Sequence, residues 1–212
     1  MRVKAIMMPF SRIACISVDN TVEEAMQIID EQRLLSLPVV NGREFVGVLS
    51  KQYMFEEYFK NFKGTKEEFV AKRVEEFMKT KIDTIGENTR IEEAAAQFIT
   101  SKVRFIPITN EKNVLLGIVT QQAVFKEYQK IFGNKHNSMA IYTYDIKGVL
   151  GKICELISKE GGDICNMMVI PTEVLDLVEI FLRVEAPDFE RVVRALERRG
   201  YDVRDVKYND QN

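Results

Sequence analysis

The sequence predicts a mixed α/β fold in which two copies of a β-α-β-β-α unit are followed by a third unit of β-α-β-β-α-β order. Two observations support this prediction. The segment LPVVNGREFVGVLS at 37–50 returns as IPITNEKNVLLGIVT at 106–120, so the chain contains an internal repeat. After residue 137 the hydrophobic pattern changes, which indicates a separate third unit.

The repeat extends well beyond these two segments. When Pro38 is aligned with Pro107, NTVEEAMQII at 20–29 falls on TRIEEAAAQF at 89–98. One extra residue in the second turn then brings Gly47 onto Gly117. Because each unit is too small to bury a large core of its own, we expect the two copies to pack together.

Each copy is expected to begin with a β-rich segment, at 12–18 and at 81–86, and to continue into an amphipathic helix. Two short strands then surround the proline-to-glycine segment, and a second helix closes the unit. The expected boundaries are 1–62 for the first copy, 63–73 for a linker, 74–130 for the second copy, 131–137 for another linker and 138–212 for the third unit.

The first helix of each copy has a candidate N-cap. Asn20 and Thr89 are followed three residues later by Glu23 and Glu92, which is the spacing of a capping box. Negative charge in the first turn of a helix interacts favourably with the helix dipole, so we interpret the acidic pairs Glu23-Glu24 and Glu92-Glu93 as first-turn residues.

The third unit predicts a ferredoxin-like order of elements. A strand at 138–144 precedes a helix that begins near Gly148 and ends at Gly161 and Gly162. Two apolar strands follow, then an amphipathic helix at 188–200 with Asp188 as its cap, and a final strand. The order β-α-β-β-α-β is that of ferredoxin-like domains.

Composition and charge narrow the class of protein. Hydrophobic residues make up 46% of the chain and charged residues 29%, and the net charge of −2 gives no general attraction to nucleic acid or to an anionic membrane. Three cysteines, Cys15, Cys154 and Cys165, have no framework spacing, which favours reduced thiols in the cytoplasm. No apolar run approaches the length of a membrane span, and the short N-terminal apolar stretch is not a signal peptide.

The repeated segments at 37–50 and 106–120 resemble the CBS motif. In each of them an apolar-Pro segment leads through a turn to Gly-apolar-apolar-Ser/Thr, and the resemblance covers roughly residues 5–130. It implies a pseudo-two-fold pair of motifs whose clefts bind adenine-containing ligands.

The CBS resemblance also implies roles for particular residues. In that family the hydroxyl that ends the second strand contacts the ligand phosphate, and Ser50 and Thr120 retain it. An aspartate three residues later contacts the ribose, but this chain has Tyr53 and Ala123 there.

Further contacts are expected mainly in the second copy. Arg104 matches a phosphate-contacting position and Thr84 a base-contacting position, whereas the first copy has Leu35 and Cys15. The second copy is therefore expected to form the stronger cleft. The complete expected nucleotide-binding set is Thr84, Arg104, Thr120, Gln122, Ala123, Ser50, Gln52 and Cys15.

The third unit resembles the ACT domain. The resemblance is carried by Asp145-x-x-Gly148-Val149-Leu150 and by Gly161-Gly162-Asp163-Ile164, although Lys147 stands where the family usually has proline and Asp163 where it often has asparagine. It implies a ligand site or interface formed by Asp145, Gly148, Val149, Leu150, Asp163 and Ile164. The CBS-CBS-ACT order is similar to the acetoin-utilisation accessory (AcuB-like) family and to bacterial cyclic di-AMP receptors.

No enzyme signature accompanies these resemblances. His136 is the only histidine, so a zinc site of the usual His/Cys type is not expected, and no Walker or dinucleotide-binding motif is present. The sequence predicts neither catalytic residues, nor a metal site, nor a cofactor.

The expected function is therefore regulatory. The CBS pair is expected to sense an adenine nucleotide such as AMP, ADP, ATP or cyclic di-AMP, while the ACT domain mediates dimerisation or binds a second ligand. We expect a homodimer that regulates a partner protein. Two alternatives stay open: an amino-acid sensor working through the ACT domain, and a ligand-free scaffold for protein interactions.

Overall fold

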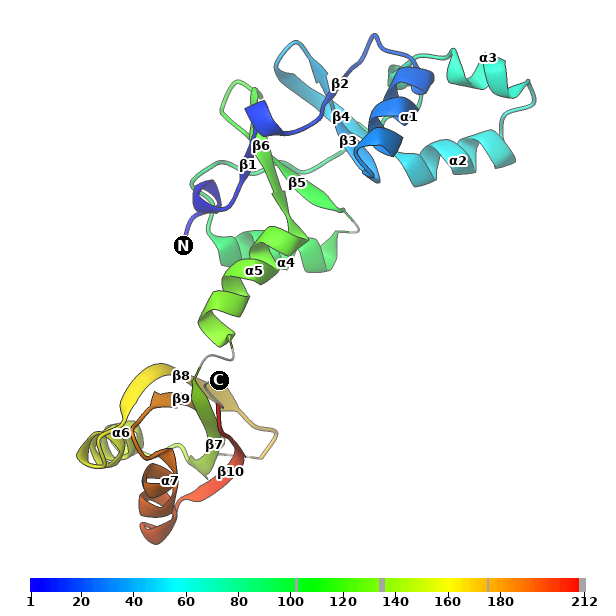
Figure 1. The fold of residues 1–212 in the computed structure, drawn as a ribbon. Coiled ribbons are helices and arrows are strands. Elements are labelled where there is room, and N and C mark those ends of the chain that lie inside the picture. The colour runs from blue at the N-terminus through cyan, green and yellow to red at the C-terminus, as the bar shows by residue number, and fades with distance from the viewer. Residues whose placement is uncertain (102, 134–135, 175, 210–212) are drawn as a thin grey trace. The chain divides into compact units, whose positions relative to one another are not determined.

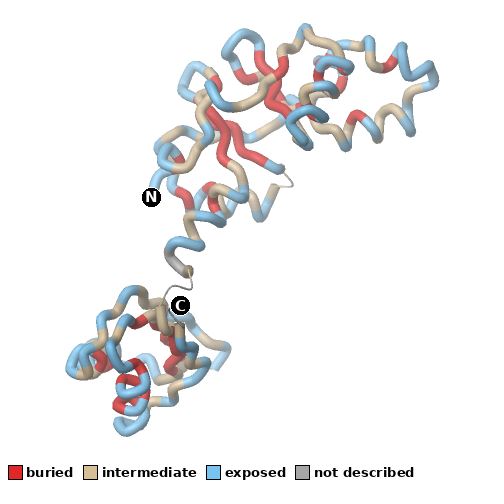
Figure 2. Tube along the Cα trace, in the orientation of Figure 1, coloured by how far each residue is buried: buried red, intermediate tan, exposed pale blue. Residues whose placement is uncertain are grey.

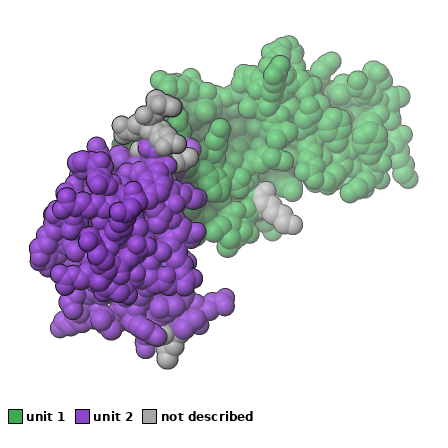
Figure 3. All heavy atoms as spheres, turned by 60° about the horizontal axis from the view of Figure 1, so that its bottom comes forward, with its two compact units in different colours: residues 1–127 green, residues 128–212 purple. Residues whose placement is uncertain are grey.

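The computed structural model describes residues 1–101, 103–133, 136–174 and 176–209. The chain forms two compact units, Met1–Glu127 and Tyr128–Asn212 (Figure 3). Within the described ranges, no helix is both long enough and apolar enough to span a membrane. The first unit contains both copies of the repeat, and the second contains the β-α-β-β-α-β segment.

The first copy has the predicted order of elements (Figure 1). Its sheet has the strand order β2-β3-β4, with β2 parallel and β4 antiparallel to the central strand. The elements are β2 (Ile16–Ser17), α1 (Val22–Glu31), β3 (Ser36–Asn41), β4 (Glu44–Ser50) and α2 (Lys51–Lys60).

The second copy contains α4 (Ile91–Thr100), β5 (Phe105–Thr109), β6 (Leu115–Thr120) and α5 (Gln121–Phe132). The β-rich segment expected at 81–86 is not a strand in the part of the chain that is described. It contributes one parallel bridge, from Ile85 to Ile108, and the third strand of this sheet comes from elsewhere.

That third strand is β1 (Met8–Pro9), which pairs antiparallel with β6. Just before it, the 3-10 helix η1 (Val3–Ala5) packs on the second copy, and its first residue donates its amide to the Thr89 carbonyl at 2.9 Å. In the first copy, the 3-10 helix η3 (Val74–Glu76) takes the equivalent place, and its first residue donates to the Asn20 carbonyl at 2.9 Å. Both valines are fully buried, so each crossing segment completes a core.

The crossing segments are themselves a repeat that the sequence analysis did not identify. RVKAIMMP at 2–9 aligns with RVEEFMKT at 73–80. The chain therefore exchanges segments: 2–9 packs on the second copy and 73–80 on the first. The expected boundaries at 62 and 74 therefore do not coincide with the limits of the two cores, because each core includes a segment from the other side of the boundary.

Each crossing segment runs against a repeated glycine. Val48 and Lys79 exchange backbone hydrogen bonds of 2.9 and 3.0 Å beside Gly47, and Pro9 pairs with Gly117. A Cβ atom at either glycine would overlap a backbone carbonyl of the crossing segment. The glycines recur because both copies need this close backbone approach.

The N-caps of the first helices differ from those expected. Thr21 caps α1, accepting from the Glu24 amide, and the Glu24 carboxylate accepts in return from the Thr21 amide. Helix α4 starts after Arg90, whose side chain makes no capping hydrogen bond with any described residue. Asn20 and Thr89 were therefore wrong as caps, because each helix begins one residue later than the spacing indicated.

The second unit has the predicted β-α-β-β-α-β order, with an antiparallel sheet of order β10-β7-β9-β8. Alternate residues of β9 are buried against α6 and α7, and the buried residues of this unit lie on its central strands and on these two helices (Figure 2). Asp188 caps α7 as predicted, accepting from the Arg191 amide at 3.0 Å. The elements are β7 (Asn137–Tyr144), α6 (Val149–Lys159), β8 (Asp163–Pro171), β9 (Leu177–Glu185), α7 (Phe189–Arg198) and β10 (Asp202–Lys207).

Replacing Gly117 with alanine should destabilise the first unit by about 1–3 kcal/mol, because the new Cβ would overlap the Met8 carbonyl. Gly151→Ala is the matched control, since Gly151 lies inside α6 with open space around it. That substitution should raise the free energy of unfolding by about 0.5–1 kcal/mol. Urea unfolding of both variants measures the difference, and equal stability of Gly117→Ala and the parent chain would contradict the close approach.

Candidate functional site

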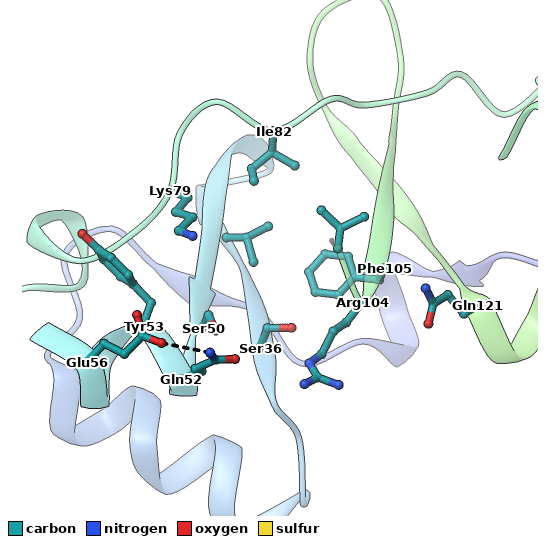
Figure 4. A pocket seen from close by; sticks show the side chains of 12 residues that line it. Ser36, Ser50, Gln52, Tyr53, Glu56, Lys79, Ile82, Arg104, Phe105 and Gln121 are labelled. Atoms are coloured by element: carbon teal, nitrogen blue, oxygen red, sulfur yellow. Dashed lines mark hydrogen bonds between the residues drawn. The ribbon is translucent and has the colours of Figure 1, made fainter. Parts of the chain in front are cut away.

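A cavity of about 590 Å³ lies between the two copies of the first unit (Figure 4). Its volume is in the range of roughly 300–1,000 Å³ that is usual for small-molecule sites. The walls come from the first copy, from the crossing segment after it, and from the start of β5 in the second copy. The lining residues are Ser36, Val48, Ser50, Gln52, Tyr53, Glu56, Lys79, Ile82, Val103, Arg104, Phe105 and Gln121.

Two cations from different segments line this cavity. Arg104, directly before β5, is exposed and makes no hydrogen bond or ion pair with the residues that are described. Lys79 comes from the crossing segment, and its Nζ lies 5.1 Å from the centre of the Tyr53 ring. An arginine without a protein partner is well suited to a phosphate, which its guanidinium binds through two parallel hydrogen bonds.

The cavity also contains one carboxylate among its described lining residues. Glu56 accepts a hydrogen bond of 2.9 Å from Gln52 through its Oε1 atom (Figure 4). The described lining residues include two cations, Lys79 and Arg104, and one acid, so their formal charge is positive. The local potential therefore favours an anion, although the whole chain carries a net charge of −2.

Two hydroxyl groups and a helix terminus add polar contacts. Ser36 and Ser50 are paired across β3 and β4, so the two residues lie at the same end of these strands. Ser50 also occupies the N-cap position of α2, but its hydroxyl makes no capping bond to the described residues. The first turn of α2, with Gln52 and Tyr53, thus lines the cavity, where the positive end of the helix dipole favours an anion.

The structure brings together only part of the expected nucleotide-binding set. Ser50, Gln52 and Arg104 line the same cavity, although Arg104 was expected to act with second-copy residues. Thr84 lies in a separate cavity of about 880 Å³, where its hydroxyl is bonded to that of Thr109 at 3.1 Å. The Thr120 hydroxyl accepts from the Ala123 amide at 3.1 Å and so caps α5. The expected grouping of Arg104 with Thr84 and Thr120 is therefore not found.

Three other expected residues lie outside this cavity. Gln122 is exposed on α5, and Ala123 beside it is half-buried. Cys15 packs against the buried cluster that contains Phe45 and Leu115. Burial raises the pKa of the Cys15 thiol to about 11, and we interpret this residue as part of the packing.

The sequence analysis missed Lys79 and Ser36. Lys79 follows η3 in a segment that was assigned to the second copy, although it pairs with Val48 of the first. The alignment of 2–9 with 73–80 is the signal that would have identified this segment as part of the first copy's core. Ser36 could have been found from its pairing with Ser50 in the predicted hairpin.

The residues expected to form an ACT site lie at opposite ends of the sheet in the second unit. Tyr144, just before Asp145, pairs with Leu177, whereas Asp163 pairs with Glu185 at the other end of β9. Gly148 has a φ of 89° and forms the N-cap of α6, so the predicted turn is present.

The apolar members of the expected ACT set divide between core and surface. Val149 is buried, and Ile164 is half-buried and packs against the same core. Leu150 and Asp145 are exposed. The six residues therefore do not form a single surface.

A model of the CBS domain matches residues 3–60 and 74–130. The chain belongs to the CBS domain family. The two matched segments contain the two copies of the repeat, and the cavity with Lys79 and Arg104 lies between these CBS motifs.

Curated relatives match about half of the chain. An uncharacterised protein of Methanocaldococcus jannaschii is 28% identical over 130 aligned residues, and the match covers 54% of this chain and 45% of that protein. The inosine-5'-monophosphate dehydrogenase of Korarchaeum cryptofilum is 27% identical over 113 residues, 53% of this chain and 22% of the enzyme. The matched region thus spans less than half the length of either relative.

Solved structures share the fold of the CBS pair. CBSX2 of Arabidopsis thaliana in complex with AMP has a TM-score of 0.55 at 23% identity, covering 62% of this chain and 98% of that one. CbpB in complex with cyclic di-AMP has a TM-score of 0.55 at 18% identity, covering 61% and 85%. A protein assigned to acetoin utilisation (AcuB) from Vibrio cholerae has a TM-score of 0.54 at 15% identity, covering 62% and 93%.

Cys15 and Cys165 should differ in their reactivity toward iodoacetamide. With a pKa of about 11, the Cys15 thiol is protonated at pH 8, and the thiolate is the reactive species. Cys165 is exposed and serves as the internal control. We expect alkylation of Cys15 to lag far behind that of Cys165 at pH 8 and to accelerate as the pH rises toward 11. Peptide mapping by mass spectrometry measures both rates, and similar rates at pH 8 would contradict the packing role.

Proposed function

We propose that this CBS protein is a regulatory protein, not an enzyme, and that it senses an adenine nucleotide in the cavity between its CBS motifs. The observation that carries the proposal is that two cations, Lys79 and Arg104, line one cavity together with Ser50. The complexes of CBSX2 with AMP and of CbpB with cyclic di-AMP support the choice of ligand class. AMP, ADP, ATP and cyclic di-AMP are the candidates.

Different parts of the cavity suit different parts of such a ligand. Arg104, Lys79 and the first turn of α2 favour a phosphate, and the Ser50 hydroxyl can donate to it. Apolar side chains, including Val48 and Ile82, offer a surface for the flat base. Neither CBS motif has the family's ribose-binding aspartate, so we assign the sugar contacts to side chains such as Gln52.

Binding at this position would couple the two CBS motifs. Lys79 is held to the first motif through its bridge to Val48, whereas Arg104 directly precedes β5 of the second. A phosphate that contacts both cations therefore gains free energy from both motifs at once. A ligand with different affinity for two arrangements of the motifs shifts the balance between them, which is the basis we propose for regulating a partner protein.

We propose that the second unit is an ACT domain that serves dimerisation or binds a second ligand. Around the Gly148 turn, Tyr144, Ile146 and Leu150 are exposed apolar side chains, which favours an interface or a small apolar ligand at this end of the sheet. An amino-acid sensor is accordingly the second candidate function, and a ligand-free scaffold is the third. The cytoplasmic location stays a prediction.

Arg104→Ala should weaken binding of an adenine nucleotide by about tenfold or more, because a charge-assisted hydrogen bond contributes roughly 1.5–3 kcal/mol. Lys112→Ala is the matched control, since Lys112 lines the separate cavity that contains Thr84. Calorimetric titration of each variant with AMP, ATP and cyclic di-AMP measures the effect. If only Lys112→Ala weakened binding, the nucleotide would occupy the other cavity; binding of amino acids alone would favour the second function.

The proposed homodimer has a candidate surface on the first CBS motif. An apolar groove of about 240 Å³ lies between α1, α2 and α3 (Lys66–Val70), lined by residues such as Met26 and Phe55. Phe59 lies at this groove and is 77% exposed. So large an exposed aromatic side chain beside an apolar groove is typical of a protein interface.

Phe59→Ser should shift the protein from dimer toward monomer, because it removes the most exposed aromatic side chain of the groove. Lys60→Ser is the control, because it changes the residue next to Phe59 in the same helix without removing apolar surface from the groove. Light scattering should give twice 24.5 kDa for the parent chain and the control. A parent chain that stays at 24.5 kDa at micromolar concentration would refute the dimer, and an unaffected dimer in Phe59→Ser would place its interface elsewhere.

A further inference from the structure

Three potential metal ligands meet at one end of the sheet in the second unit. His136, Cys165 and Glu185 each offer one donor atom, and the three donors lie within 4.8 Å of one another. Nδ1 of His136 is 3.9 Å from Oε2 of Glu185. An imidazole, a thiol and a carboxylate are three of the ligand types that zinc uses in proteins.

Strand register accounts for this meeting of residues that are distant in sequence. Asn137 pairs with Val184, so His136, directly before β7, lies beside Glu185. On the other side of β9, Asp163 pairs with the same glutamate. Glu185 therefore lies between a ligand from the β7 side and one from the β8 side.

A β-bulge provides the third donor. The register of β8 against β9 shifts between Ile164 and Asn166, so Cys165 is the extra residue of the bulge. Bulges of this kind redirect a side chain and are common beside functional sites. Here the Cys165 Sγ lies 3.8 Å from the Asp163 carbonyl oxygen, at the end of the strand where Glu185 also lies.

The donors are open to solvent and need little movement. The side chains of His136 and Glu185 are 35% and 67% exposed, and both line a surface cavity of about 670 Å³ that Asp163 also lines. Around a tetrahedral zinc ion, with bonds of about 2.0–2.3 Å, two donor atoms lie roughly 3.3–3.8 Å apart. The present spacing therefore requires a closure of about 1 Å, which rotation of exposed side chains can supply.

We propose that His136, Cys165 and Glu185 bind a zinc ion at this end of the sheet. Thiolate and imidazole favour zinc over magnesium or calcium, which require oxygen ligands. Binding replaces the S–H bond of Cys165 by an S–Zn bond and releases the proton to solvent. Three protein ligands leave the fourth position for water or for an external ligand.

The site would join the start of β7 to β8 and β9. Because His136 directly precedes β7, the ion would fix the point at which the chain enters the sheet of the second unit. The sequence analysis predicted no metal site, since His136 is the only histidine and a zinc site of the usual His/Cys type was not expected. The proposal rests on the second unit alone and does not depend on nucleotide binding.

Cobalt substitution tests the proposal, because Co²⁺ bound to a thiolate absorbs in the near ultraviolet. The full chain, purified without a histidine tag, should bind Co²⁺ at a ratio of one to one, and excess Zn²⁺ should displace it. Cys165→Ser should abolish the thiolate band, while His136→Ala and Glu185→Gln should each weaken zinc binding at least tenfold. Cys154→Ser is the matched control, because Cys154 lies in α6 outside the cluster, and it should leave the band unchanged.

Two results would overturn the proposal. One is a thiolate band that persists in Cys165→Ser or disappears in Cys154→Ser, which would assign the metal to another cysteine. The other is the absence of stoichiometric binding of Co²⁺ and Zn²⁺ by the parent chain at 100 μM metal. Circular dichroism shows whether each variant is folded. A variant that has lost its fold is replaced by the conservative His136→Gln or Cys165→Ala.

Discussion

The close approach of two crossing segments to the backbone of β4 and β6 determines the rest of the first unit. Gly47 and Gly117 permit it, because a side chain at either position would overlap a carbonyl of the crossing segment. The approach allows Val48 and Lys79 to exchange two backbone hydrogen bonds. Each segment thereby completes the core of the copy on which it packs, so the copies are joined by exchanged chain as well as by side-chain contact.

The same exchange explains why the two copies are chemically unequal. Residue 79 of the crossing segment corresponds to Met8 in the other, and Arg104 corresponds to Leu35, three residues before the repeated proline. One side of the pseudo-symmetric pair thus has two cations, and the equivalent positions on the other side have none. Within the described residues neither cation has an acidic partner, although the Lys79 ammonium lies 5.1 Å from the centre of the Tyr53 ring. Both are therefore available to the phosphate of the proposed ligand.

The repeat predicted the helices and the paired strands of both copies, because hydrophobic periodicity and turn residues are local signals. It placed both N-caps one residue too early and expected a strand at 81–86 that the structure replaces with β1. The functional residues were misplaced where the answer depended on contacts between copies. Sequence equivalence placed Arg104 with Thr84 and Thr120, but equivalence cannot tell which copy a residue faces across a pseudo-two-fold axis. The structure places Arg104 with Ser50. Similarly, the cluster around Glu185 depends on strand register and on one bulge, neither of which leaves a spacing signature.

The proposed site, with walls from both copies, also sets how strongly a bound nucleotide would regulate. A ligand that prefers one arrangement of the motifs by a factor of about 100 gains roughly 2.7 kcal/mol of differential binding, which moves a two-state balance from about 1:10 to 10:1. Lys79 and Arg104 together can supply this, since each charge-assisted hydrogen bond to phosphate is worth roughly 1.5–3 kcal/mol. The effect requires that both cations contact the phosphate in one arrangement and that only one of them contacts it in the other. Because backbone bonds hold Lys79 to β4 of the first motif and Phe105 is paired with Thr120 of β6 in the second, the change requires the two motifs to move relative to each other.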